Sequence, residues 1–360
     1  MPASARANAH TASKHFAVLN APAMRPISAI DYHTAGEPFR IVAAPPVTIH
    51  GTTVAEKRVL AMRDPEVDGL RRLLCFEPRG HADMYGGFIV PSDDAGAHLG
   101  VLFWHKDGFS TACGHGTIAL GAWAIDSGLV APDPSGVTEV RVDVPSGRVT
   151  ARVHRTGDRT TAIDFINVPS YVVATDIGVD TTRGELRVDV AFGGAMYAFL
   201  DASRIGLTVT PKRYAELIAI GREIKWRLNE ADVARHPTDD RLSGIYGTVI
   251  VEDLGTDDAG NRCERNVAVF ADGEVDRSPC GSGTAARVAL LAMSGRLERG
   301  QELVNEAIVG TRFRAGIVAE ATADGHRAVI PEVTGMAYRT GEHTFELHPD
   351  DPIGVGFVLR

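Results

Sequence analysis

The chain has 360 residues, of which 44% are hydrophobic and 23% are charged, a composition typical of a folded protein with one or two cores. Disorder over most of the chain is therefore excluded, and no apolar run approaches the roughly 18 residues that would predict a membrane span. The formal net charge of −9 argues against a protein that binds nucleic acid by neutralising phosphates.

Residues 1–26 are rich in alanine, proline and polar residues and lack the apolar core of a secretory signal. We expect them to form a poorly ordered tail. The four cysteines, Cys75, Cys113, Cys263 and Cys280, include no C-x-x-C pair and do not form a disulfide framework. A reducing cytoplasm is therefore the expected compartment.

Short runs of β-branched and alternating residues predict strands along the rest of the chain. These runs are 27–32, 39–44, 101–104, 140–144, 149–153, 188–192, 247–251, 266–270, 313–320 and 327–333. Residues 140–144 and 149–153 flank a Pro-Ser-Gly turn and predict a hairpin. Helices are fewer: we expect them at 53–62, 66–74 and 211–229, and directly after Cys113 and after Cys280.

The two segments that begin at Cys113 and Cys280 resemble each other. Residues 113–128 and 280–295 match at eight of sixteen positions without a gap, including the cysteine, two glycines and a threonine. This repeat predicts a duplicated α/β fold, each copy being a curved, mostly antiparallel sheet around a central helix. The predicted boundary lies near 169–184. The expected parts are an N-terminal subdomain (27–170), a C-terminal subdomain (171–345) and a final segment (346–360) that packs back on the first subdomain.

A cysteine immediately before a helix lies beside unpaired backbone N–H groups and the positive end of the helix dipole. Both effects lower a thiol pKa and favour the thiolate. The same N–H groups can bind a carboxylate, and the adjacent glycines let a ligand approach the backbone. If the two copies face each other, one sulfur can remove an α-proton while the other delivers a proton to the opposite face.

Other interpretations of these cysteines are weaker. Two buried thiols that only pack where a strand meets a helix remain an alternative, although packing alone does not require cysteine twice. A zinc site could use Cys113, His115, Asp276 and Cys280, but this spacing matches no structural zinc motif. A cysteine hydrolase with Cys113 and His115 would leave Cys280 unexplained. No dinucleotide or phosphate-binding motif occurs, and the five lysines suggest no Schiff-base residue.

Longer motifs identify a family. These motifs are His33-Thr34-Ala35-Gly36-Glu37-Pro38, Glu77-Pro78-Arg79-Gly80-His81, Cys113-Gly114-His115-Gly116 and Asp276-Arg277-Ser278-Pro279-Cys280-Gly281-Ser282-Gly283. Through them the sequence resembles the proline racemase superfamily, from 27 to 360. The resemblance implies two subdomains like those of diaminopimelate epimerase, with a cofactor-independent and metal-free site in the cleft between them.

The resemblance also assigns roles to residues of that site. Cys113 and Cys280 are the implied catalytic pair, and Asp276 is expected to hold the ring amine of an imino acid. The implied carboxylate site consists of Gly114, His115, Gly281 and Ser282. Tyr85 and Phe270 are the expected aromatic walls, and the Tyr85 phenol is a candidate hydrogen-bond partner for a substrate hydroxyl.

Within the superfamily, racemases and epimerases use two cysteines, whereas typical dehydratases carry threonine at the second position. The segments around Tyr85, Tyr197 and Tyr246 resemble the dehydratases, but Cys280 matches the racemases and epimerases. We therefore expect a trans-3-hydroxy-L-proline dehydratase with 2-epimerase activity. The alternatives are a 4-hydroxyproline 2-epimerase or proline racemase, and a non-catalytic imino-acid-binding protein. The expected partner is a small imino acid, with no nucleic acid or membrane; a homodimer is left open.

Overall fold

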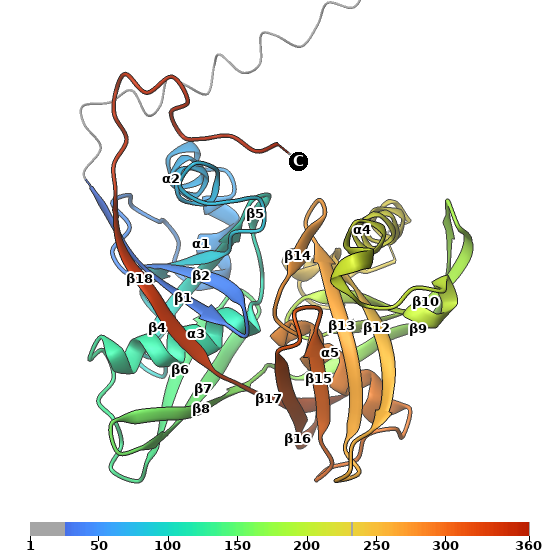
Figure 1. Ribbon diagram of the computed structural model, residues 1–360. Coiled ribbons are helices and arrows are strands. Elements are labelled where there is room, and N and C mark those ends of the chain that lie inside the picture. The colour runs from blue at the N-terminus through green and yellow to red at the C-terminus, as the bar shows by residue number, and fades with distance from the viewer. Residues whose placement is uncertain (1–25, 232, 360) are drawn as a thin grey trace, which may run out of the picture.

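A computed structural model describes residues 26–231 and 233–359, which form two lobes (Figure 1). Of the predicted tail, only Pro26 lies within the described residues. The first lobe contains β1 (Ile27–Thr34), β2 (Glu37–Val42), α1 (Val54–Ala61), α2 (Pro65–Cys75), β3 (Gly86–Val90), β4 (Leu99–His105), β5 (Gly108–Phe109), α3 (Gly114–Asp126), β6 (Val137–Val144), β7 (Gly147–Thr156) and β8 (Arg159–Ile166).

The second lobe begins with a strand hairpin and carries the other central helix (Figure 1). Its elements are β9 (Ser170–Thr181), β10 (Gly184–Phe192), β11 (Met196–Asp201), α4 (Tyr214–Glu230), β12 (Ile245–Thr256), β13 (Arg262–Phe270), β14 (Glu274–Asp276), α5 (Gly281–Met293), β15 (Leu303–Ala307), β16 (Arg312–Ala323) and β17 (His326–Gly335). Short 3₁₀ turns at Ala202–Ile205, Pro211–Arg213 and Asp240–Leu242 connect them. The last strand, β18 (Ala337–Phe345), returns to the first lobe and pairs with β1.

The strand pairing of the first lobe is repeated in the second. In the first lobe β2 pairs parallel with β3, β3 antiparallel with β4, and β4 parallel with β6. In the second lobe β11, β12, β13 and β15 pair in the same order and directions. In each lobe the second parallel crossover contains the central helix: α3 lies between β4 and β6, and α5 lies between β13 and β15. The duplication predicted from the repeated cysteine segments is thus visible in the topology.

Helix α3 lacks a polar face because the sheet of the first lobe surrounds it. Every residue of α3 from Gly114 to Ile125 is buried, as expected for a helix that lacks a polar face. Gly121 gives α3 close contact with the sheet, since a Cβ at this position would lie 2.7 Å from the Ala151 Cβ. The surface helices start at ordinary caps: Thr53 caps α1, and Asp64 followed by Pro65 starts α2, close to the predicted bounds.

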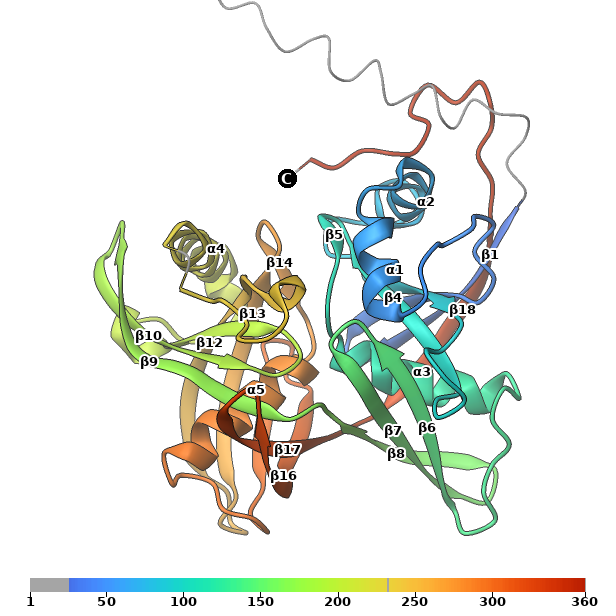
Figure 2. The same cartoon turned by 180° about the vertical axis from the view of Figure 1, so that it is seen from behind.

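Two crossings join the lobes, as seen from behind in Figure 2. The chain runs from β8 into β9 and returns from β17 into β18, and β17 pairs with both β8 and β9. Strand β9, which pairs with β10, occupies most of the predicted boundary at 169–184. The division into subdomains itself stays a prediction, but the chain returns to the first lobe at Ala337, before the expected residue 346.

The final segment packs on the first lobe. Phe357 forms a β-bridge with Glu77, and the Arg79 guanidinium lies 3.4 Å from the Asp351 carboxylate. Within the described ranges, no helix is both long enough and apolar enough to cross a membrane.

Candidate active site

The two central helices meet at their N-termini, where both begin with glycine. A Cβ built on Gly114 would lie 2.6 Å from the Gly281 Cα, and one built on Gly281 would lie 2.7 Å from the Gly114 Cα. These distances are too short for any side chain, so the approach of the helices requires glycine on both sides. The residues that precede these glycines, Cys113 and Cys280, are thereby brought to one cavity.

Every site residue predicted from the sequence lines that cavity. Its lining includes Tyr85, Cys113, Gly114, His115, Phe270, Asp276, Cys280, Gly281 and Ser282. It also includes Ala112, Tyr197, Tyr246 and Ala268, which the sequence analysis did not select. The open volume is about 10 Å³, close to the space that one water molecule needs. The structure confirms that the predicted residues lie together, while their roles stay predictions.

Cys113 caps helix α3 with extended backbone. Its φ is −156°, and its Sγ accepts a hydrogen bond from the Gly116 N–H at 3.2 Å. The two ring nitrogens of His115 lie 3.5 and 3.6 Å from the same sulfur. Thr34 Oγ1 donates to the His115 carbonyl at 2.9 Å, so the first predicted motif holds the start of this helix in place.

Cys280 has a different backbone and different partners. Its φ of 63° lies in the left-handed region, which costs a non-glycine residue about 1–2 kcal/mol. Its N–H donates to Ser278 Oγ at 3.1 Å, and its thiol donates to Tyr197 Oη at 3.8 Å. Tyr197 Oη also lies 2.6 Å from Ser282 Oγ. A strained residue beside a cavity is typical of a functional site.

Burial raises the pKa of both thiols well above the ordinary value for cysteine. This corrects the expectation that the helix N-termini would bring these pKa values toward neutrality. The Gly116 N–H does lower the pKa of Cys113, but loss of water has the larger effect, and the nearby Asp276 carboxylate raises both values further.

Asp276 lies at the end of β14, four residues before Cys280. Its Oδ1 accepts hydrogen bonds from the Ser278 N–H at 2.8 Å and the Ser278 hydroxyl at 2.7 Å. Burial raises the pKa of Asp276 to about 6, although these hydrogen bonds oppose the shift. Its Oδ2 lies 3.8 Å from His115 Nδ1. Burial lowers the pKa of His115 to about 3, so this imidazole is neutral and does not compensate the Asp276 charge.

Two acidic residues of the first lobe hold the segment that carries Asp276. Glu37 Oε2 accepts a hydrogen bond from the Arg277 N–H at 2.8 Å, and the Arg277 guanidinium lies 2.6 Å from Asp83 Oδ2. Asp83 Oδ1 also accepts from the Val275 N–H at 3.1 Å. Glu37 is fully buried, and desolvation together with nearby Asp276 raises its pKa well above the usual range. These contacts fix the position of Asp276 across the two lobes.

An aromatic wall closes the cavity. The rings of Tyr246 and Phe270 stack at 5.6 Å with an interplanar angle of 13°, and Tyr85 packs 5.8 Å from Phe270. Tyr246 and Tyr197 were not selected as site residues from the sequence. The only signal for either was that the surrounding segments resemble those of dehydratases.

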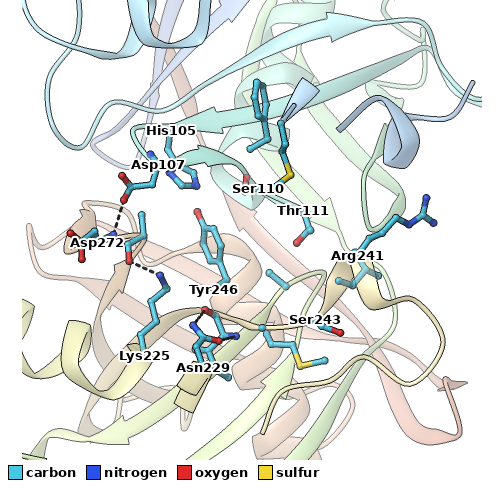
Figure 3. Close-up of a pocket in the computed structure, with 18 of the residues that line it drawn as sticks. His105, Asp107, Ser110, Thr111, Lys225, Asn229, Arg241, Ser243, Tyr246 and Asp272 are labelled. Carbon is cyan, nitrogen blue, oxygen red and sulfur yellow. Dashed lines mark hydrogen bonds between the residues drawn. The ribbon is translucent and has the colours of Figure 1, made fainter. Parts of the chain in front are cut away.

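Beyond Tyr246 lies a larger cleft of about 760 Å³ (Figure 3). We call it the outer cleft. It is lined by His105, Ser110 and Thr111 of the first lobe and by α4 residues of the second lobe, among them Lys225 and Asn229. Burial lowers the pKa of Lys225 to about 8, and its ammonium donates to the Ala271 carbonyl. Tyr246 lines both spaces, so its side chain lies between the cavity and the outer cleft.

No group of three or more His, Cys, Asp or Glu side chains in the described residues has the arrangement of a metal site. The zinc alternative, which drew on Cys113, His115, Asp276 and Cys280, therefore gains no geometric support.

Comparison with known proteins gives matches along nearly the full chain. The family model described as "Proline racemase" matches residues 29–358. The chain is 41% identical to the trans-3-hydroxy-L-proline dehydratase of Homo sapiens, over 93% of this chain and 95% of that protein. It is 40% identical to the trans-3-hydroxy-L-proline dehydratase of Bacillus cereus, over 92% of this chain and 97% of that protein.

A solved structure confirms the fold. The crystal structure of a hydroxyproline epimerase from Agrobacterium vitis, with bound trans-4-hydroxy-L-proline, superposes with a TM-score of 0.86 at 30% identity. The match covers 93% of this chain and 96% of that one. The predicted fold, two similar halves of curved sheet around central helices, is thereby confirmed.

Proposed function

Because this chain belongs to the proline racemase family, we propose that it is a cofactor-independent enzyme that removes the α-proton of a hydroxyproline. Its principal reaction is the dehydration of trans-3-hydroxy-L-proline to pyrroline-2-carboxylate, with epimerisation at C2 as a second activity. The two dehydratases that are about 40% identical over almost the full length support this choice of substrate.

The observation that carries the proposal is the convergence of two thiols and two helix N-termini on one cavity. The backbone N–H groups at Gly114-His115 and Gly281-Ser282 can bind the substrate carboxylate. The Asp276 carboxylate lines the same cavity and can pair with the cationic ring nitrogen. Both interactions stabilise the negative charge that develops at Cα as the proton leaves.

Substrate stereochemistry favours a single thiol for both proton transfers of the dehydration, and we assign them to Cys113. In trans-3-hydroxy-L-proline the 3-hydroxyl and the α-hydrogen lie on the same face of the ring. The Cys113 thiolate takes the α-proton, the C–H electron pair forms the Cα–C3 double bond, and the C3–O bond breaks. The new thiol then faces the departing hydroxyl and returns the proton to it as water. The enamine product tautomerises to pyrroline-2-carboxylate.

Cys280 favours the second activity. A thiol on the opposite face can deliver a proton to C2 before the hydroxyl leaves, and this inverts the configuration. A 4-hydroxyproline 2-epimerase or proline racemase is therefore the alternative principal function, supported by the similarity to the Agrobacterium vitis epimerase. A non-catalytic imino-acid-binding protein would need the cavity but neither thiol.

Substrate entry requires movement of the lobes, because a cavity of about 10 Å³ is far too small for an imino acid. The crossings β8–β9 and β17–β18 are the strands about which the lobes can open. We propose that the protein works in the cytoplasm on a small imino acid; a homodimer is an open part of this proposal.

The test is a parallel assay of trans-3-hydroxy-L-proline, trans-4-hydroxy-L-proline and L-proline that follows pyrroline formation and optical rotation together. We expect pyrroline from the 3-hydroxy substrate alone, with a change of optical rotation for the other two. Epimerisation of 4-hydroxyproline without any pyrroline from the 3-hydroxy substrate would favour the alternative function. If none of the three substrates gave pyrroline or incorporated solvent deuterium at C2, a binding protein would be favoured.

A further inference from the structure

Three hydroxyl groups meet at the border between the cavity and the outer cleft. Tyr85 Oη is hydrogen-bonded to Ser110 Oγ and lies 3.0 Å from Tyr246 Oη. Tyr85 and Tyr246 line the cavity, while Ser110 and Tyr246 line the outer cleft. Figure 3 shows the Tyr246 hydroxyl turned toward Ser110 and His105. We call Tyr85, Ser110 and Tyr246 the hydroxyl cluster.

The hydroxyl cluster belongs to the Cys113 side of the cavity. The Tyr85 ring packs 5.0 Å from His115 and 6.4 Å from Phe39, and a Cβ on Gly116 would touch both the Phe39 ring and Cys113 Sγ. The other hydroxyl pair of the cavity, Tyr197 and Ser282, lies beside Cys280. Cys280 thus has a hydroxyl partner of its own in Tyr197, whereas Tyr85 lies on the His115 side of the cavity.

The surroundings of the cluster suit a hydroxyl ligand rather than a charged one. Tyr85 is 2% exposed and its neighbours Phe39 and Phe270 are apolar, so the phenol is the polar group that Tyr85 presents to a bound ring. Burial raises the pKa of Tyr85 and of Tyr246 well above the usual range, so both phenols remain hydrogen-bond donors. His105 contributes a ring 5.6 Å from Tyr85, and its Nδ1 already accepts the Asp107 N–H.

We propose that the hydroxyl cluster binds the 3-hydroxyl of the substrate, with Tyr85 as the direct donor, and thereby determines that this enzyme dehydrates. This inference rests on the proposed function and names the residues that give it its specificity. A hydrogen bond from Tyr85 strengthens as negative charge develops on the departing oxygen, so it lowers the barrier to C–O cleavage. The proton that completes water comes from the Cys113 thiol, and all three cluster hydroxyls keep theirs.

The cluster also gives the new water a way out. Ser110 and Tyr246 connect the cavity to the outer cleft of about 760 Å³, so water formed at Tyr85 can move along hydroxyl groups to solvent. Loss of water from the cavity makes the elimination harder to reverse.

The first test compares two reactions of one enzyme. Tyr85→Phe removes the donor and keeps the ring, and we expect the ratio of dehydration rate to α-proton exchange of L-proline to fall roughly 100-fold. Ser110→Ala should lower the same ratio by a smaller factor. The matched control is Tyr32→Phe, which removes a phenol bonded to Asp126 outside the cavity and should leave the ratio unchanged. Because a ratio is measured, partial loss of folded protein does not alter the result.

The second test measures binding and does not depend on dehydration. In a Cys113→Ser background, calorimetry compares trans-3-hydroxy-L-proline with L-proline, with and without Tyr85→Phe. We expect Tyr85→Phe to weaken binding of the hydroxylated ligand roughly tenfold relative to L-proline, the effect of about one hydrogen bond. If wild type only epimerises, the proposed function fails, and this binding ratio still decides whether the hydroxyl cluster binds the 3-hydroxyl. An unchanged ratio in both tests would overturn it.

Discussion

The two thiol-bearing ends of the central helices derive from one repeated segment, yet they are built differently. Cys113 has extended backbone and accepts the Gly116 N–H, whereas Cys280 has a φ of 63° and contacts Tyr197 and Ser278. The positions four residues before the cysteines also differ, since Phe109 in the first copy corresponds to Asp276 in the second. The first copy has the hydroxyl cluster beside it, and the second has the carboxylate.

This difference suggests how one fold supports two outcomes. In the proposed mechanism, the groups that remove the α-proton and release the 3-hydroxyl lie on the Cys113 side. The groups that bind the ring amine and deliver a proton to the other face lie on the Cys280 side. Substitutions on the Cys113 side and on the Cys280 side test this difference in turn.

The largest effect is expected from Cys113→Ser. A serine hydroxyl is a much weaker base near neutral pH, so both dehydration and epimerisation of L-substrates should fall by about 10³-fold or more. Initial rates of pyrroline formation and of deuterium incorporation at C2 measure the two reactions. More than a few per cent of residual activity would contradict the two-thiol mechanism.

The next largest effect is expected on KM when Asp276, the carboxylate that only the second copy carries, is replaced. Asp276→Asn removes the charge that pairs with the ring nitrogen, and KM should rise by about 10- to 100-fold with a smaller change in kcat. Asp133→Asn, at an exposed turn where the carboxylate accepts the Ser135 N–H, is the control. Unchanged KM together with lower thermal stability would indicate that Asp276 serves only the local turn.

A smaller effect, on stability, is expected from a substitution at the contact between the N-termini of α3 and α5. Gly281→Ala places a Cβ against the Gly114 backbone, so the helix ends must separate, at a cost of about 1–3 kcal/mol in the free energy of unfolding. Gly316→Ala is the control, because its Cβ would meet only the Gln301 carbonyl, at 3.4 Å. Urea denaturation measures both variants, and equal stabilities would show that the helix contact is not tight.

The smallest expected effect is that of pH, which should act on KM through Asp276 and on kcat/KM through Cys113. Burial raises the pKa of Asp276 to about 6, so the carboxylate is protonated below that pH and KM should rise as pH falls through about 6. The raised pKa of Cys113 means that more thiolate forms as pH increases, so kcat/KM should keep rising above neutrality. Asp276→Asn should remove the acid limb alone; an acid limb that persists would assign it to another group.

Much of this site could be predicted from the sequence because its main elements are local. The repeated Cys-Gly-x-Gly-Thr starts fix the two helix ends, and the paired glycines permit their contact. Periodicity and turn residues likewise predicted the hairpin that β6 and β7 form, with Val142 opposite Val149.

The remainder depends on contacts between segments far apart in the chain. Tyr246 and Ser110 join Tyr85 only after the lobes fold together, and no local pattern marks such a cluster. Strand β9 was missed because exposed polar residues, Thr175, Asp176 and Asp180, interrupt the apolar pattern of its outer half. The thiol pKa was predicted in the wrong direction because a helix start is visible in sequence, whereas complete burial is not.

The division of labour between the two sides is tested most directly by Cys280→Thr. Two reactions are measured on the same preparation. One is pyrroline formation from trans-3-hydroxy-L-proline, and the other is solvent-deuterium incorporation with inversion at C2 of trans-4-hydroxy-L-proline. A threonine hydroxyl is too weak an acid to protonate the far face quickly, so we predict that inversion is lost while much of the dehydration is retained. Loss of dehydration together with inversion would show that Cys280 takes part in removing the hydroxyl, and would contradict the assignment of that reaction to the Cys113 side.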